Sequence, residues 1–366
     1  FGALSSAILV FAIGLVYGVT GSTNIGVVVT TFASLGPDLV PVALLAVGLF
    51  IAGFGFKMGL VPFHMWLPDA ISALLDAGTK KAGFAAAIRV VILGMFALHT
   101  DWTLVLAILA VFTMTLGNLA ALMQKSVTRI LAYSSIAQAG YMLIGMALAP
   151  YSQEALTGSL FQIFNHAIMK STAFIAAACV SVALASYSLE KYRGLGRRMP
   201  ITAIALSISL LALAGLPPLN GFWSKLVLFS AGINSGPLVE WGPYLAIAGI
   251  LNSALSLGYY AWVIRKMYME ESPNMDRVKE PKAMVAVMMF GIVFMVGFGI
   301  WHAPILEFAS EAVPNLSNTI SLFSTNSTGE TLVQPLTTPT SSFILAHAGS
   351  VFDERTYSLA ATAAAN

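Results

Sequence analysis

The sequence predicts an all-α protein that crosses a membrane many times. Hydrophobic residues make up 58% of its 366 residues and charged residues only 9%, against about 45–50% and about 25% in soluble domains. The mean hydropathy of +0.84 agrees with this composition. Apolar runs long enough to span a bilayer recur along the chain, too often for the core of a soluble protein. The hydropathy therefore excludes a soluble enzyme and a nucleic-acid-binding protein.

Nine apolar segments are predicted to span, each with about the 17–25 residues or more that a spanning helix needs. They are residues 1–20, 39–62, 71–98, 103–123, 127–149, 155–185, 200–232, 243–268 and 283–301. The second segment ends in Lys57 and then Pro62, and the seventh is interrupted at Pro217-Pro218. Because proline removes a backbone donor and kinks a helix, we expect discontinuous helices at both places. Broken membrane helices gather around polar cavities, since their freed carbonyls need partners.

Six of the eighteen Lys and Arg residues lie inside these apolar runs. They are Lys57, Lys80, Lys81, Arg89, Lys170 and Lys225. A basic side chain at the bilayer centre costs roughly 2.5–3.5 kcal/mol on insertion scales. An ionisable residue at such a position therefore indicates a function, and lysine suits proton relay because a buried ammonium group can release its proton. The pattern favours a proton-conducting membrane protein.

The remaining basic residues predict the orientation in the membrane. Eleven of them fall in the loops 124–129, 190–198 and 265–282, whereas the opposite loops carry acidic residues and no Lys or Arg. By the positive-inside rule the basic loops are cytoplasmic. With nine spans, the C-terminal tail then lies outside the cell membrane.

The chain divides into a transmembrane domain, residues 1–312, and a polar Ser/Thr-rich tail, residues 313–366. Phe1 lies within an apolar run without an initiator Met, which indicates a chain cut from the middle of a helix. The single cysteine, Cys179, excludes a disulfide framework and an iron–sulfur cluster held by this chain alone. The five histidines lack zinc-ligand spacing. We expect neither a metal site nor a cofactor site in this chain.

Three long motifs carry a resemblance to a known family. They are FKMGLVPFHMWLPDA at 56–70, GNLAALMQKSVTRILAYSSIAQAGYMLIG at 117–145 and YRGLGRRMPITAIALSISLLALAGLPPLNGFWSKLVLF at 192–229. Together they resemble the antiporter-like proton-translocating subunits of respiratory complex I and its relatives, the multisubunit cation/proton antiporters and membrane-bound hydrogenases. Residues 1–22 look most like the N-type subunit. The HAIMK run at 166–170 is closer to the L- and M-type pattern, which suggests an archaeal or otherwise divergent N-type protein.

The resemblance covers about residues 1–312 and implies a fold of fourteen helices with two inverted five-helix repeats. This chain would carry the sixth to the fourteenth helix. The fifth helix, with the glutamate that pairs with the first key lysine, is then missing. A short family segment with a Glu-Ala-Pro core is also absent between Ala70 and Ile71.

Three lysines match the family's relay positions. The resemblance implies that Lys57 is the first-half channel lysine, that Lys80 is the central lysine and that Lys225 is the second-half lysine at the outward exit. For Lys57 the alternative is a lysine that snorkels from a helix end.

Three further residues are predicted to assist. Asp76 lies one turn before Lys80 and is interpreted as a local modulator of that lysine. The alternative is that Asp76 and Lys80 form a simple ion pair, which neutralises their charges and so allows the helix to insert into the membrane. His166 and Lys170, four residues apart, share a helix face, and in L- and M-type relatives this pair lies on the central polar axis. The alternative for His166 is a hydrogen bond to a carbonyl. Lys81 points about 100° away from Lys80, so we expect only one of these two lysines to face the axis.

Other polar residues in the spans receive weaker assignments. Arg89 cannot deprotonate and is interpreted as a structural or field-setting charge. Gln138 replaces a histidine usual in the family, so a relay through it needs water. A hydrated path or helix–helix contacts are the alternatives for Thr79, Tyr133, Ser134 and Ser135.

These observations predict the proton-translocating membrane subunit of a complex-I-like oxidoreductase. The sequence contains no nucleotide loop and no cysteine cluster, so energy must come from partner subunits. The resemblance implies that the partners include membrane subunits of the L, M and K types. It also implies that partner subunits hold the redox cofactors and the quinone or phenazine, and that NADH, deazaflavin or ferredoxin feeds them. The alternatives are a subunit of a multisubunit cation/proton antiporter and a non-conducting membrane scaffold.

Overall fold

The computed structural model describes residues 2–70 and 74–313, and the regular structure there is helical apart from one isolated bridge between Ser126 and Ser188. Seven helical stretches in these ranges are long and apolar enough to cross a membrane. They contain α1 (Gly2–Thr20), α3 (Val40–Met58), α6 (His99–Leu122), α7 (Val127–Leu148), α8 (Gln153–Leu184), α12 (Gly242–Met269) and α13 (Lys282–Ile300). The predicted all-α polytopic membrane protein is confirmed at this level. The count of nine spans is not confirmed.

The other two predicted segments are built from shorter helices. The segment at 71–98 contains, in its described part, η2 (Leu75–Thr79), α5 (Lys80–Ala87) and η3 (Ile88–Gly94), which follow one another directly. Both η2 and η3 are π-helical. The segment at 200–232 is the pair α10 (Pro200–Ala214) and α11 (Asn220–Asn234).

Several short helices lie between the long ones or follow the last of them. They are α2 (Ile25–Ala33), η1 (Pro37–Leu39), α4 (Leu67–Ala70), η4 (Phe96–Leu98), η5 (Leu189–Tyr192), α9 (Leu195–Arg198) and α14 (Ala303–Ala312). Sequence analysis did not single out these elements, because none is long enough to span a bilayer.

Both predicted helix breaks are present. Helix α3 ends at Met58, where Gly59 adopts a left-handed conformation with φ of +71°, and regular helix returns only in α4, beyond Pro62. Helix α10 ends in the same way at Gly215, with φ of +86°, and α11 begins after Pro217-Pro218. Glycine is needed at both caps because residues with a Cβ rarely adopt this conformation.

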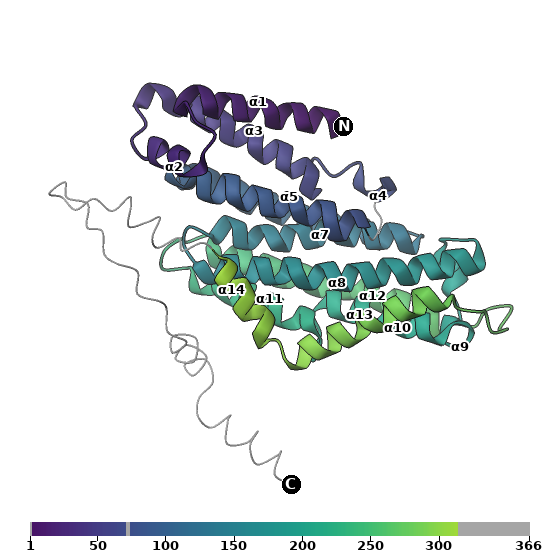
Figure 1. Cartoon of the computed structure of the whole chain (residues 1–366). Helices are drawn as coiled ribbons and strands as arrows, with labels where there is room; N and C mark the ends of the chain where they lie inside the picture. Colours follow the sequence, from purple (N-terminus) through teal and green to yellow (C-terminus); the bar gives the residue numbers. More distant parts are fainter. Residues whose placement is uncertain (1, 71–73, 314–366) are drawn as a thin grey trace, which may run out of the picture. The chain divides into compact units, whose positions relative to one another are not determined.

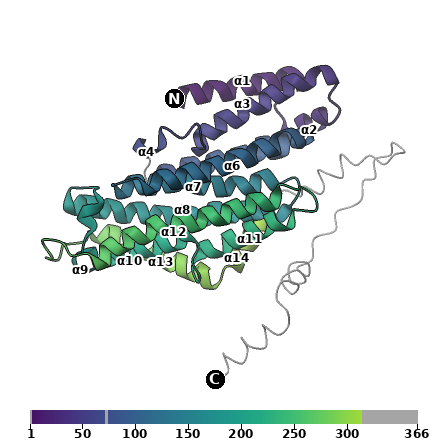
Figure 2. The same cartoon turned by 180° about the vertical axis from the view of Figure 1, so that it is seen from behind.

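Helix α7 lies at the centre of the packing within residues 2–313. It contacts α6, α8, α11 and α12, and Figure 1 shows it running beside α5 and α8. Seen from behind in Figure 2, α6 lies along it. A Cβ added at Gly140 of α7 would lie 2.7 Å from the backbone nitrogen of Met114, so α6 and α7 approach closely at this point. Over an 18-residue stretch of α7, 94% of the residues are buried.

The predicted polar tail, residues 313–366, lies outside the described residues except for its first residue. The division of the chain into 1–312 and 313–366 therefore stays a prediction.

Candidate functional site

Helix α7 carries the polar side chains around which the buried lysines gather. Ser134, Ser135 and Gln138 are all within 1% of complete burial. Because successive helical residues point about 100° apart, the two serines face different neighbouring helices. Each serine contacts a different lysine, and Gln138 reaches toward a third.

Lys80 is fully buried against Ser135. Its Nζ donates to the backbone oxygen of Ser135 at 2.5 Å and to the Ser135 Oγ at 2.9 Å. The Oδ1 atom of Asp76 lies 3.7 Å from the same Nζ and accepts a hydrogen bond from Ser135. The predicted proximity of Asp76 and Lys80 at i,i+4 spacing is therefore present in the structure.

Lys81 joins the same cluster, which corrects the expectation that only one of the two lysines faces the axis. Its Nζ lies 3.7 Å from Asp76 Oδ2 and 2.7 Å from His166 Nδ1. The reason is the π-helical turn in η2, where the Lys80 N–H bonds to the carbonyl of Leu75, five residues back. In this wider turn both the fourth and the fifth residue after Asp76 lie near its carboxylate.

His166 and Lys170 lie on one face of α8, as predicted, but they contact different partners. His166 Nδ1 lies 3.6 Å from Asp76 Oδ2. Lys170 Nζ instead donates to Ser134 Oγ at 2.5 Å, and that hydroxyl lies 2.5 Å from the Tyr260 hydroxyl. Lys170 thus belongs to a second polar group beside the one around Asp76.

Lys225 occupies the helix break between α10 and α11. It is 4% exposed, and its Nζ donates to the carbonyls of Leu213 at 2.8 Å and Ala214 at 3.1 Å. It also donates to Ser253 Oγ at 2.8 Å. These carbonyls are among the last of α10, which have no partner within the helix and carry the negative end of its dipole. The proline break thereby creates the acceptor site for this lysine.

A chain of hydrogen bonds connects Lys225 to α7. The Leu213 carbonyl that accepts from Lys225 also accepts from Gln138 Nε2 at 3.0 Å. Gln138 Oε1 accepts from Gln162 at 2.9 Å, and Gln162 Oε1 accepts from Ser224 at 2.5 Å. Gln138 therefore stands next to the second-half lysine, and it makes this link without titrating.

Lys57 is the predicted relay residue that the structure does not bring into this network. It lies in the last turn of α3 and is half-buried. Its backbone and Cβ pack on α5, since a Cβ at Gly83 would lie 3.3 Å from Lys57 Cβ. In the described part of the chain its ammonium group has neither a hydrogen bond nor an ion pair.

Sequence analysis missed a further buried polar group on α6, α7 and α12. Asn118 Nδ2 donates to Tyr141 Oη at 3.2 Å and to Asn252 Oδ1 at 3.1 Å. Tyr259 donates to Asn118 Oδ1 at 3.0 Å, and the Tyr259 ring contacts that of Tyr260 with centroids 4.4 Å apart. An asparagine inside each of two apolar helices was the available signal.

The other polar residues of the predicted spans differ in how deeply they are buried. Arg89 and Thr79 are exposed in the structure, and Tyr133 is half-buried. In residues 2–70 and 74–313 no group of three or more His, Cys, Asp and Glu side chains gathers to hold a metal ion.

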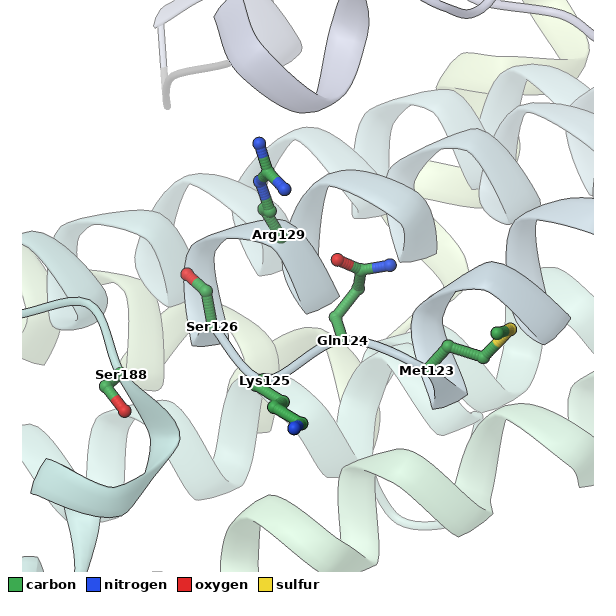
Figure 3. Close-up of a pocket in the computed structure, with 6 residues that line it drawn as sticks. All are labelled: Met123, Gln124, Lys125, Ser126, Arg129 and Ser188. Carbon is green, nitrogen blue, oxygen red and sulfur yellow. The ribbon is translucent and has the colours of Figure 1, made fainter.

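A separate hollow of about 540 Å³ lies at the loop between α6 and α7, away from the buried lysines (Figure 3). It is lined by Met123, Gln124, Lys125, Ser126, Arg129 and Ser188. Arg129 pairs with Asp69 at 2.8 Å, and both side chains are mostly exposed. The lining contains no acid–base pair, so this hollow does not extend the lysine network.

Buried ionisable side chains beside broken helices are typical of helical membrane proteins that move ions. The family model described as NADH:quinone oxidoreductase/Mrp antiporter, TM matches residues 1–256, and the chain belongs to this family.

Two curated relatives are subunits named N. The F(420)H(2) dehydrogenase subunit N of Methanosarcina mazei is 43% identical over 328 residues, which cover 85% of this chain and 65% of the relative. The NADH-quinone oxidoreductase subunit N of Chlorobium chlorochromatii is 38% identical, with 84% and 63% covered. The chain thus spans slightly less than two thirds of the length of these relatives.

Solved structures show the same fold. A chain of the membrane-bound sulfane sulfur reductase, an archaeal respiratory membrane complex, matches with a TM-score of 0.73 at 30% identity, covering 87% of this chain and 66% of that one. A chain of respiratory complex I from Thermus thermophilus matches with a TM-score of 0.63 at 29% identity, covering 84% and 66%. A chain of the Mrp complex from Dietzia reaches 0.76 at 23% identity, covering 88% and 67%, and this likeness concerns the fold alone.

Proposed function

We propose that this chain is a proton-translocating membrane subunit of a complex-I-like oxidoreductase. The observation that carries the proposal is the burial of three lysines, Lys80, Lys170 and Lys225, around the polar side chains of α7. Each ammonium group donates to hydroxyl or backbone oxygens, and Lys80 also lies 3.7 Å from Asp76. Hydroxyl and carbonyl partners allow a lysine to be charged or neutral.

Proton movement follows from coupling among these charges. Two unit charges 4 Å apart interact by about 4 kcal/mol at an effective dielectric constant of 20. A proton that arrives at one buried site therefore disfavours the charged form of its neighbour, and the sites titrate as a group. A change of charge at one end of an assembly is passed along as successive proton releases.

We assign Lys57, Lys80 and Lys225 as the relay, with His166, Lys170 and Asp76 as auxiliary residues. Lys57 is the first-half residue and Lys80 the central one. The α10 carbonyls hold Lys225 on the exit side. Gln138 supports the step between the central region and Lys225, because it shares the Leu213 carbonyl with that lysine.

We propose that energy comes from partner subunits. The relatives named above are subunits of an F(420)H(2) dehydrogenase and of NADH-quinone oxidoreductases. By this analogy the chain would stand beside L-, M- and K-type subunits. The partners would supply the redox cofactors and the quinone or phenazine, and this chain would have no redox centre.

The proposed topology has nine spans. It counts η2–α5–η3 as one membrane segment and the α10–α11 pair as one discontinuous segment. The basic loops 124–129, 190–198 and 265–282 then face the cytoplasm, by the positive-inside rule, and the C-terminal tail lies outside.

The test is proton pumping by the assembled complex in proteoliposomes. Replacement of Lys80 by Met should lower the number of protons moved per electron pair while electron transfer continues. A cation/proton antiporter would instead exchange protons for sodium without an electron donor. Full pumping in the Lys57→Ala, Lys80→Ala and Lys225→Ala variants would favour the scaffold and contradict the proposal.

A further inference from the structure

One buried carboxylate lies between two lysines and a histidine. Asp76 is the only Asp or Glu in the fully buried class among the described residues. Its Oδ1 faces Lys80 and Ser135, whereas its Oδ2 faces Lys81 and His166. One negative charge therefore serves two sides of the cluster. It can balance only one of the positive charges that Lys80, Lys81 and His166 are able to carry.

The contact between Lys81 and His166 requires a shared proton. Their nitrogens are 2.7 Å apart, which is a hydrogen-bond distance between two nitrogens. One proton must lie between them, bonded either to Lys81 Nζ or to His166 Nδ1. In the first state Lys81 is an ammonium and His166 is neutral with its proton on Nε2. In the second, Lys81 is an amine and His166 an imidazolium.

Asp76 is nearly equidistant from the two nitrogens. Its Oδ2 lies 3.7 Å from Lys81 Nζ and 3.6 Å from His166 Nδ1. Since Coulomb energy depends on distance, the carboxylate stabilises the positive charge almost equally in both states. The counter-ion therefore does not trap the proton on one partner, as it would if it contacted only one of them.

We propose that Lys81 and His166 are a proton-transfer pair, with Asp76 as their shared counter-ion. This proposal rests on the proposed function and adds Lys81 to it as a residue that carries a proton. In the transfer the Nζ–H bond of Lys81 breaks and the Nδ1–H bond of His166 forms. The total charge of the pair is unchanged and moves from α5 to α8.

The same geometry couples the pair to Lys80. Lys80 competes for the carboxylate through Oδ1. A proton that arrives at Lys80 draws on the carboxylate that balances the pair, so the charge on Lys80 is coupled to the charge that Lys81 and His166 share. The Nε2 atom of His166 is buried without a hydrogen-bond partner in the described chain. A buried polar atom of this kind calls for a water molecule, through which the ring can exchange its second proton.

Substitutions at Lys81 separate proton transfer from simple charge pairing. Lys81→Arg keeps the positive charge beside Asp76 but cannot release a proton. Lys81→Met removes both the charge and the proton. The measurement is the ratio of pumped protons to electron pairs in proteoliposomes that contain the assembled complex, with assembly checked by subunit composition and electron-transfer rate. Lys125→Arg in the exposed loop is the matched control and should keep the wild-type ratio.

We expect both Lys81 variants to lower coupled proton flux by about 10²-fold, the lower end of the effect of losing a proton-transferring group. If Lys81→Arg pumps as many protons per electron pair as the wild type, Lys81 acts only as the ion-pair partner of Asp76, and the proposal is overturned. Failure of the wild-type complex to pump, or full pumping in Lys80→Met, would instead contradict the proposed function.

A double-mutant cycle with His166→Asn tests the pair even if one variant assembles poorly. If the proton passes from Lys81 to His166, the Lys81→Met/His166→Asn double variant should pump no worse than whichever single variant pumps less. Losses that multiply would show that the two residues act separately and would overturn the proposal.

Discussion

Lys57 and Lys225 occupy matching places in the sequence, each beside a proline-containing helix break, yet their surroundings differ. Lys225 is 4% exposed and donates to Leu213, Ala214 and Ser253. Lys57 is half-buried, and its ammonium group has no polar partner among the described residues. The difference lies in which end of the break holds the lysine. Lys225 follows the break and faces the exposed carbonyls of α10, whereas Lys57 precedes it, in the last turn of α3.

This comparison shows that a helix break alone does not make a lysine site. The break frees backbone carbonyls, and a lysine uses them only when packing turns its side chain back toward them. Gly215 permits this approach in the second half, because a Cβ there would lie 2.9 Å from Lys225 Cδ. The two lysines should therefore respond differently to one and the same substitution.

Lys225→Met should produce the largest effect. It removes a proton-carrying group, and loss of a proton-transferring side chain typically costs roughly 10²–10⁴-fold in rate. It also removes one of the donors to the Leu213 and Ala214 carbonyls, which keep Gln138 and Ser253, so each lost hydrogen bond should cost about 0.5–1.5 kcal/mol. We expect loss of proton pumping in proteoliposomes together with a lower Tm of the purified assembly. An unchanged Tm would show that Gln138 and Ser253 satisfy these two carbonyls without the lysine.

Lys57→Met should give a smaller change in stability. The lysine is half-buried and unpaired in the described chain, so its replacement should shift the free energy of unfolding by no more than about 0.5 kcal/mol. Its assignment to the relay nevertheless predicts reduced pumping. A normal Tm with reduced proton flux would fit a relay residue, whereas normal values of both would leave it as a lysine that snorkels to the interface.

Ser253→Ala refines the account of Lys225. The hydroxyl is one of three acceptors for this ammonium, and it also donates to the Ala214 carbonyl at 3.1 Å. Its loss should lower stability by about 1 kcal/mol. Pumping should fall less than in Lys225→Met, since two carbonyls still hold the lysine. Complete loss of pumping would place the hydroxyl itself in the proton path.

Glu270→Gln should have the smallest effect, because Glu270 is a half-buried residue at the C-terminal end of α12, away from the buried lysines of the relay. Glu270 accepts from Lys266 at 3.1 Å and from Arg193 at 2.9 Å, and the hydrogen bond from Lys266 is the main reason that its pKa lies below its ordinary value of 4.5. Because the folded pKa is the lower one, the pair stabilises the fold above about pH 4.5 and is lost as the pH falls below it.

Thermal unfolding of the wild type and of Glu270→Gln measures this contribution. The measurements should run from about pH 3.5 to about pH 7, a range that spans the titration of an ordinary glutamate. The two proteins should differ slightly at neutral pH and converge in acid. High salt should shrink the difference, because dissolved ions screen the attraction between charges near the protein surface. A difference that persists in acid would assign Glu270 a role other than its charge.

Much of the fold could be predicted from residue order. Long apolar runs indicate spanning helices because hydrocarbon accepts only apolar side chains and satisfied backbones. Gly215 with Pro217-Pro218, and Gly59 before Pro62, mark the breaks, since glycine permits the left-handed cap and proline resists helix. The burial of Lys80, Lys170 and Lys225 also followed, because protein partners stabilise a charge inside an apolar run. Arg89, in the same run as Lys80, is exposed instead.

Apart from Asp76 beside Lys80, the partners of these lysines could not be predicted, because contacts across tens of residues depend on how helices rotate against one another. The 100° rule placed Lys81 away from the axis, and one π-helical turn brought it to Asp76 and His166 instead. The hydroxyls of the adjacent residues Ser134 and Ser135 accept from two different lysines, because α7 lies between the helices that carry them. Residue types and spacing identify which groups can carry charge in a membrane, while packing sets the distances that determine which of them exchange it.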